Sequence, residues 1–218
     1  ALEKINTIFK ENDIAVMVGG TGLYAKAFCE GMDEIPTIDE KLRQELNQQY
    51  QQKGIAWLQE EVRRRDPVYF EKGEIQNPQR LLRALEVVMQ SGKFITSFQT
   101  RAKKERDFNI IKIGLELPRD VLYERINKRV GQMMEQGLLD EVKTLLPYQH
   151  LNALQTVGYK EVFSYFKNET SLEQAVDDIK KTTRHYAKRQ MTWFKKDTYI
   201  KWCGVSFEEV LKTINTSE

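Results

Sequence analysis

Residues 14–30 contain an apolar run, a glycine-rich turn and a helical pattern in direct succession, and this order constrains the fold most. The run from Ile14 to Val18 is short, continuous and rich in β-branched residues, which is typical of a strand buried in a parallel sheet. A Gly-Gly-Thr-Gly turn at 19–22 ends the run, and helical spacing resumes over 23–30. Strand, turn and helix in this order predict an α/β fold.

Only two further strands are expected, at 109–117 and 199–202, and the rest of the chain has mostly helical spacing. Three strands are too few for this much helix, because the sheet that they form would be narrow and badly covered. We therefore expect part of a parallel sheet with flanking helices, whose remaining strands precede residue 1.

The segment from Pro36 to Gly73 differs in character, because it is polar and rich in glutamine. Its helical stretches, 40–52 and 55–65, have few apolar positions and are separated by Gly54. Such helices can bury little surface. We predict a small inserted helical domain at 36–74, mobile against an α/β core formed by residues 1–35 and 75–218.

Several helix ends are marked by local chemistry. Asn77 followed by Pro78 predicts the start of a helix that ends near Gly92. Pro118 opens a long helix that Gly137 interrupts, and a serine at position 171 caps another that runs to about residue 196.

Composition excludes several classes of protein. No apolar run approaches the roughly 20 residues that cross a bilayer, so no membrane association is expected. The two cysteines, Cys29 and Cys203, cannot form a disulfide framework or a cysteine-based zinc site, and no metal site is predicted. A reducing cytoplasm is the expected compartment.

Positive charge is concentrated in residues 179–196, which carry seven basic side chains and no acidic one. On a helix, Lys180, Lys181, Arg184, Lys188 and Lys195 share one sector of about 100°, and Ile179, Tyr186 and Trp193 lie on the opposite, core-facing side. A cationic ridge on an amphipathic helix fits binding of a nucleic-acid backbone. A solvated lysine-rich face is the alternative interpretation.

Two other segments are candidates for phosphate and base recognition. The turn at 19–22 would present backbone N–H groups and the Thr21 hydroxyl at a helix N-terminus, although it lacks the Gly-Lys-Ser/Thr ending of a phosphate loop. Gln79 and Arg83 share a helix face, where Gln suits adenine and Arg suits phosphate. An intrahelical pair between Arg83 and Glu86 is the plain alternative.

Six blocks of sequence together resemble the tRNA dimethylallyltransferase family in order and spacing. They are Val-Gly-Gly-Thr-Gly-Leu-Tyr at 18–24, Asn-Pro-Gln-Arg-Leu-Leu-Arg-Ala-Leu-Glu-Val at 77–87, Leu-Tyr-Glu-Arg-Ile-Asn-Lys-Arg-Val at 122–130, Gly-Leu-Leu-Asp-Glu-Val at 137–142, Val-Gly-Tyr-Lys-Glu at 157–161, and Tyr-Ala-Lys-Arg-Gln-Met-Thr-Trp-Phe at 186–194. Six ordered matches are far more specific than any single one.

The resemblance implies a P-loop-kinase-like core with an inserted helical domain. It implies transfer of a dimethylallyl group from its diphosphate to N6 of the adenosine 3′ to the anticodon, with Mg²⁺ assisting departure of pyrophosphate. The implied partners are the tRNA anticodon stem-loop and dimethylallyl diphosphate, and the protein is expected to be a monomer.

Site residues follow from the same resemblance. Arg125 and Thr21 are the implied catalytic residues, and the diphosphate would be held by Gly19, Gly20, Arg125 and Arg184. The implied tRNA contacts are Thr21, Arg43, Gln79, Arg80, Arg83, Gln155, Val157, Gly158, Tyr159, Lys160, Lys188, Arg189, Gln190, Trp193 and Lys195.

One departure from the family pattern is large. The family begins with a phosphate loop and a segment that carries the expected general base, and neither occurs in these 218 residues. We therefore expect this chain alone to transfer no dimethylallyl group. A non-catalytic RNA-binding module is the alternative function, whereas a small-molecule P-loop kinase would leave the RNA-contact blocks unexplained.

Overall fold

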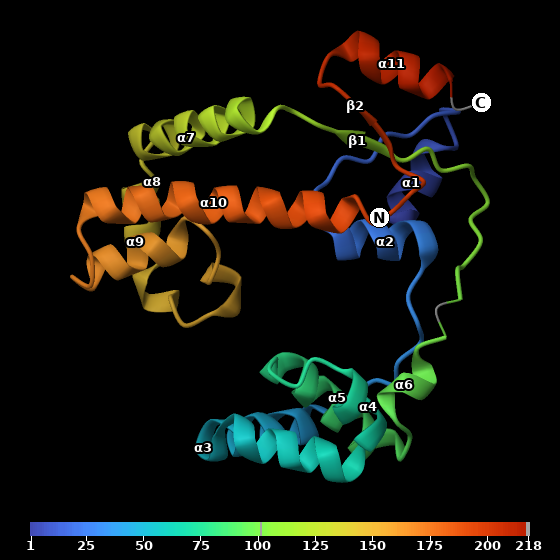
Figure 1. Ribbon diagram of the computed structural model, residues 1–218, viewed down its shortest axis with the longest axis vertical. Coiled ribbons are helices and arrows are strands. Elements are labelled where there is room, and N and C mark those ends of the chain that lie inside the picture. The colour runs from blue at the N-terminus through green and yellow to red at the C-terminus, as the bar shows by residue number, and fades with distance from the viewer. Residues whose placement is uncertain (101, 217–218) are drawn as a thin grey trace. The chain divides into compact units, whose positions relative to one another are not determined.

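The computed structural model describes residues 1–100 and 102–216 (Figure 1). The chain divides into two compact units. The first contains residues 1–13 and 26–107, and the second contains residues 14–25 and those from 108 onward. Helix α2 (Gly22–Glu30) begins in the second unit and ends in the first.

The first unit is helical, and its core lies between two helices. Its elements are α1 (Leu2–Ile8), α3 (Glu40–Arg65), α4 (Pro67–Lys72), α5 (Pro78–Ser91) and α6 (Ile95–Phe98). Leu58 and Val62 of α3 pack with Leu81 and Leu85 of α5, and all four are fully buried. The few apolar positions of α3 thus suffice for a core, because α5 supplies a continuous leucine stripe.

This packing bears on the expected domain boundaries. Helix α5 belongs to the same unit as α3, so the boundary placed between residues 74 and 75 falls inside a packed helical unit. The inserted domain at 36–74 and its mobility stay predictions.

The expected helix ends are found where local chemistry placed them. The Asn77 side chain accepts a hydrogen bond from the Arg80 backbone N–H at 3.3 Å, and Gly92 ends α5 in the left-handed region at a φ of 69°. At Gly54, a φ of 75° interrupts the helical geometry within α3. The predicted break between the two glutamine-rich stretches is therefore confirmed.

The second unit combines helices with a small parallel sheet. Its elements are β1 (Ile113–Leu115), α7 (Arg119–Glu135), α8 (Leu138–Thr144), the 3₁₀ turns η1 (Leu146–Tyr148) and η2 (Asn152–Leu154), α9 (Tyr159–Phe166), α10 (Leu172–Phe194), β2 (Lys201–Cys203) and α11 (Phe207–Asn215). Figure 1 shows α10 running between α7 and α9. The core joins Val130 of α7, Val142 of α8, Val162 of α9 and Ile179 of α10. Strands β1 and β2 pair in parallel, with Ile113 opposite Lys201.

The prediction of a strand at 14–18 is wrong for this structure. These residues have no regular secondary structure, and the exposed fractions of Ile14, Val16 and Val18 are 76%, 81% and 91%. A strand exists only where a neighbour completes its backbone hydrogen bonds. Within the described residues the sheet consists of β1 and β2, and neither pairs with this run.

The expected orientation of α10 is correct only for its first half. Ile179 is buried, but Tyr186 and Trp193 are 40% and 45% exposed. The buried residues of this helix are Ala175 and Ile179, both near the core that α7, α8 and α9 provide. Later apolar positions of the helix extend beyond that core.

Candidate functional site

The glycine turn at 19–22 contacts the end of α10. The Gln190 side-chain amide donates a hydrogen bond to the Gly20 carbonyl, with Nε2 and O 2.9 Å apart. A Cβ on Gly20 would collide with the Gln190 side chain, and a Cβ on Gly22 would collide with the Trp193 ring. The structure therefore brings together Gly20, Thr21, Gln190 and Trp193, which the sequence places about 170 residues apart. Gly19 lies exposed at the start of the turn.

Four of the seven basic residues at 179–196 fall into two groups. Lys188 and Arg189 are exposed, and the Arg189 guanidinium lies 5.8 Å from the centre of the Tyr186 ring. Lys180 and Lys195 instead form ion pairs, with Asp177 at 3.0 Å and with Glu116 at 2.6 Å. A paired lysine carries less free charge toward a phosphate. Among these four side chains, Lys188 and Arg189 thus carry the most free charge toward a ligand.

Arg184 is held between α7 and α10. Its guanidinium donates a hydrogen bond to the Asn127 side-chain oxygen at 2.9 Å and lies 5.7 Å from the centre of the Tyr123 ring. Tyr123 also accepts a hydrogen bond from Arg119 at 3.0 Å.

Arg125, the implied catalytic arginine, lies on another side of α7. It is exposed, and within the described residues it forms no ion pair. Tyr123 and Asn127, one helical turn apart, face α10, whereas a residue midway between them points away from that face. Arg125 of α7 and Arg184 of α10 therefore lie on different sides of α7.

The 155–160 segment leads from η2 into α9. Gly158 is buried, with a φ of 99°, and its N–H donates to the Glu161 carboxylate at 2.8 Å, which caps the helix. Tyr159 donates a hydrogen bond to Glu141, and this carboxylate raises the pKa of the Tyr159 hydroxyl. Gln155 donates to the Gln149 carbonyl. Val157 and Lys160 remain on the surface.

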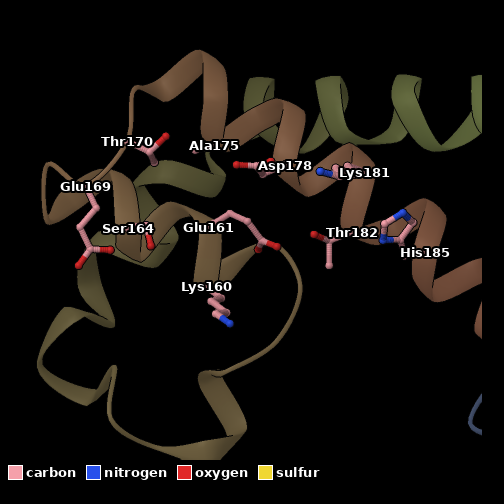
Figure 2. A pocket seen from close by; sticks show the side chains of 10 residues that line it. All are labelled: Lys160, Glu161, Ser164, Glu169, Thr170, Ala175, Asp178, Lys181, Thr182 and His185. Carbon is pink, nitrogen blue, oxygen red and sulfur yellow. The ribbon is translucent and has the colours of Figure 1, made fainter.

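An open groove lies between α9 and α10 (Figure 2). Its volume is about 520 Å³, and its charged lining residues are Lys160, Glu161, Glu169, Asp178 and Lys181, with His185 at one end. Both acidic and basic side chains line it. Such a mixed lining does not select an anion. Of the implied tRNA contacts, Lys160 is the one that lines this groove.

The four implied tRNA contacts of the first unit lie on α3 and α5. The Glu86 carboxylate, whose side chain is only 8% exposed, pairs with Arg43 and with Arg83, each at 3.3 Å. Arg80 pairs with Glu74 at 2.9 Å, and Gln79 is exposed. The intrahelical pair considered as the plain alternative for Arg83 is therefore present. The same carboxylate also fixes the orientation of Arg43 on the neighbouring helix.

This double ion pair predicts a measurable effect on stability. We expect Glu86→Gln to lower the free energy of unfolding by about 1.5 kcal/mol, because two guanidinium groups lose a nearly buried carboxylate. Glu74→Gln removes an exposed pair and is the matched control, with an expected change below about 0.5 kcal/mol. Urea unfolding followed by circular dichroism measures both, and equal changes would contradict the prediction.

Sequence patterns missed two residues that organise these surfaces. Asn127 holds Arg184 and Glu116 holds Lys195, yet each has the sequence context of an ordinary surface residue. Glu86 was expected as a partner of Arg83, but its pair with Arg43 on the neighbouring helix was not. No helix among residues 1–100 and 102–216 is long and apolar enough to cross a membrane.

Comparison with known proteins places these features in a family. A model of the family described as "IPP transferase" matches residues 1–197. The chain is 48% identical, over 98% of its length, to a protein of Christiangramia forsetii named "tRNA dimethylallyltransferase", of which it covers 70%. It is also similar to the crystal structure of a tRNA isopentenylpyrophosphate transferase from Bacillus halodurans, with 35% identity, a TM-score of 0.53, and coverage of 91% of this chain and 63% of that one.

A third comparison supports the fold alone. A eukaryotic dimethylallyltransferase described as acting on tRNA matches with a TM-score of 0.71 at 24% identity, over 94% of this chain and 55% of that one. The chain therefore spans roughly between half and seven tenths of the length of these relatives.

Proposed function

Because the chain belongs to the IPP transferase family, we propose that it is part of an enzyme that transfers a dimethylallyl group from dimethylallyl diphosphate to tRNA. The acceptor is N6 of the adenosine on the 3′ side of the anticodon. The observation that carries this proposal is the contact between the Thr21 turn and α10, because it brings together two of the blocks on which the family resemblance rests, 18–24 and 186–194.

The reaction needs a fixed environment for a leaving anion. N6 forms a bond to C1 of the dimethylallyl group while the bond from C1 to the diphosphate oxygen breaks. The electron pair leaves with pyrophosphate, and N6 gives up one proton to the general base that the family resemblance implies. Fixed cations and N–H donors stabilise the charge that builds on the leaving oxygens. Arg125 and the backbone of the 19–22 turn are the proposed donors, whereas the Arg184 guanidinium already donates to Asn127 on another side of α7.

Access to N6 requires the adenosine to leave the stack of the anticodon loop. Unstacking costs a few kcal/mol, which contacts to the RNA backbone must offset. Lys188 and Arg189 are the best placed for such contacts, because both are exposed and neither forms an ion pair within the described part of the chain. Arg43, Gln79, Arg80 and Arg83 are proposed as further tRNA contacts from the helical unit.

Magnesium enters the proposal only as a counter-ion of the diphosphate. Among the described residues, no three His, Cys, Asp or Glu side chains gather as a metal site built from protein ligands alone would need. Magnesium is usually held by one or two carboxylates together with substrate phosphates. It therefore stays an implication of the resemblance, and every step above uses side chains and backbone alone. None of the observations favours the alternative of a non-catalytic RNA-binding module, and a cytoplasmic monomer stays a prediction.

A transfer assay tests the proposal. Dimethylallyl diphosphate labelled in its prenyl group is incubated with the full-length protein and an anticodon stem-loop. We expect label on the adenosine 3′ to the anticodon and none when that base is guanosine. Transfer to both stem-loops, or to neither, would contradict the proposed substrate.

The different surroundings of Lys188 and Lys195 predict different effects of their substitution on tRNA binding. Lys188→Ala should weaken tRNA binding similarly across tRNA sequences and should lower the slope of log K against log salt by about 1, because one phosphate contact is lost. Lys195→Ala should have less effect, since Glu116 already pairs with that ammonium group.

Fluorescence anisotropy over a series of salt concentrations measures this difference. The control is Lys212→Ala, which removes an exposed lysine of α11. Equal slopes for Lys188→Ala and Lys212→Ala would mean that the ridge is only a solvated face.

A further inference from the structure

Thr21 lies in a segment that forms few hydrogen bonds within the described residues. Residues 14–21 have no regular secondary structure, and most of them are exposed. Within the described part of the chain, these eight residues take part in two hydrogen bonds. One joins the Gln190 amide to the Gly20 carbonyl, and the other joins the Ala25 N–H to the Thr21 carbonyl at the start of α2. Within the described residues, the turn thus takes its contacts from α2, which follows it, and from α10.

Two side chains of α10 make that contact. Gln190 and Trp193 are three residues apart and so lie on one face of the helix. Each reaches one glycine: Gln190 packs on Gly20, and Trp193 packs on Gly22. Neither glycine has a positive φ, so glycine is needed for close approach and not for its backbone freedom.

Gln190 and Trp193 differ from the neighbouring cations in what their side chains contact. The Gln190 amide donates one hydrogen bond to the turn, and the Gly22 backbone covers part of the Trp193 ring. The side chains of Lys188 and Arg189, on the other hand, are exposed. One stretch of α10 thus carries both a face that holds the turn and side chains that are open to a ligand.

We propose that Gln190 and Trp193 are positioning residues, which fix the turn at 19–22 and thereby place the Thr21 hydroxyl. This assigns them a role in the protein's own structure in place of the direct tRNA contact that the family resemblance implied. The inference rests on the proposed function for the role of Thr21, but the contact between turn and helix does not depend on it.

A double-mutant cycle in the full-length protein tests the link to Thr21. Gln190→Ala should lower kcat about tenfold and leave KM for tRNA nearly unchanged, because a small displacement of a reacting or orienting group slows the chemical step. The double variant with Thr21→Ala should be no slower than the slower single variant, since both changes remove the same contribution. A residue that contacts tRNA directly would instead raise KM and give multiplicative effects, which would overturn the proposal.

A second measurement is independent of any transfer activity. Fluorine NMR of the protein labelled with 5-fluorotryptophan reports on the Trp193 ring, whose resonance is assigned by its loss in Trp193→Phe. Gln190→Ala should shift this resonance, because release of the turn uncovers the ring at Gly22. Lys196→Ala, an exposed change just beyond α10, is the matched control and should leave it in place.

The two measurements separate the inference from the proposed function. If no variant and no wild-type protein transfers the label, the proposed function fails, and the fluorine spectrum still decides whether Gln190 holds the turn. An unchanged Trp193 resonance in Gln190→Ala overturns the positioning role whatever the activity is.

Discussion

Replacing Asp66 with alanine should lower the free energy of unfolding by about 3 kcal/mol, because one buried and one part-buried backbone N–H group would lose a charged acceptor. One carboxylate oxygen accepts from the Tyr69 N–H at 2.9 Å and so caps α4, and the other accepts from the Ile95 N–H at 3.0 Å. Asp66 is fully buried. Water therefore cannot replace the buried bond to the Ile95 N–H, and the loss would affect the junctions of α3, α4 and α6 together.

Two further variants make this prediction specific. Asp66→Asn keeps the shape and one acceptor oxygen, so about half of the loss is expected. Asp39→Ala removes an exposed cap that accepts from the Lys41 N–H at 2.7 Å, and there about 1 kcal/mol is expected. Urea unfolding curves of the three variants supply the comparison. A loss for Asp66→Ala no larger than that for Asp39→Ala would show that the buried position adds nothing.

Features governed by local chemistry were predictable from sequence. The start of α5 at Pro78, its end at Gly92, the cap of α10 at Ser171 and the break at Gly54 each depend on a few adjacent residues. The same is true of the pair between Arg83 and Glu86, which are three residues apart on one helix.

Features that depend on distant partners were not predictable. The run at 14–18 has the composition of a strand, but strand formation requires a neighbouring strand, which no local pattern encodes. Arg43 reaches Glu86 across 43 residues, and Gln190 reaches Gly20 across 170. The packing of α5 on α3, which joins the predicted insertion to the following helix, is of the same kind.

The resemblance located the candidate residues, and the structure sorts them by what they already contact. Arg43, Arg80, Arg83, Arg184 and Lys195 have partners within the chain. A ligand would have to share or displace those partners. Lys188 and Arg125 are exposed without an ion pair in the described ranges, so a ligand phosphate would meet their full charge.

This difference makes Arg125 the substitution with the largest expected effect on catalysis. In the full-length protein, Arg125→Ala should lower kcat about 100-fold while KM for dimethylallyl diphosphate changes little. A guanidinium that meets the departing pyrophosphate acts mainly in the transition state, where the charge on the leaving oxygens is greatest. Thr21→Ala should have a smaller effect, since a neutral hydroxyl contributes less than a charged donor.

Matched variants on α7 and a single-turnover assay decide whether Arg125 acts on the leaving group. Lys128→Ala removes an exposed charge one turn further along the helix and should leave kcat within about twofold, because a solvated charge there contributes little. Arg125→Lys keeps the charge but loses the planar two-donor geometry, so an intermediate rate is expected. Equal losses for Arg125→Ala and Lys128→Ala would reduce Arg125 to a contributor to general surface charge. A rise in KM with kcat unchanged would place it in ground-state binding of the diphosphate, since such an interaction is equally strong before and during the transfer.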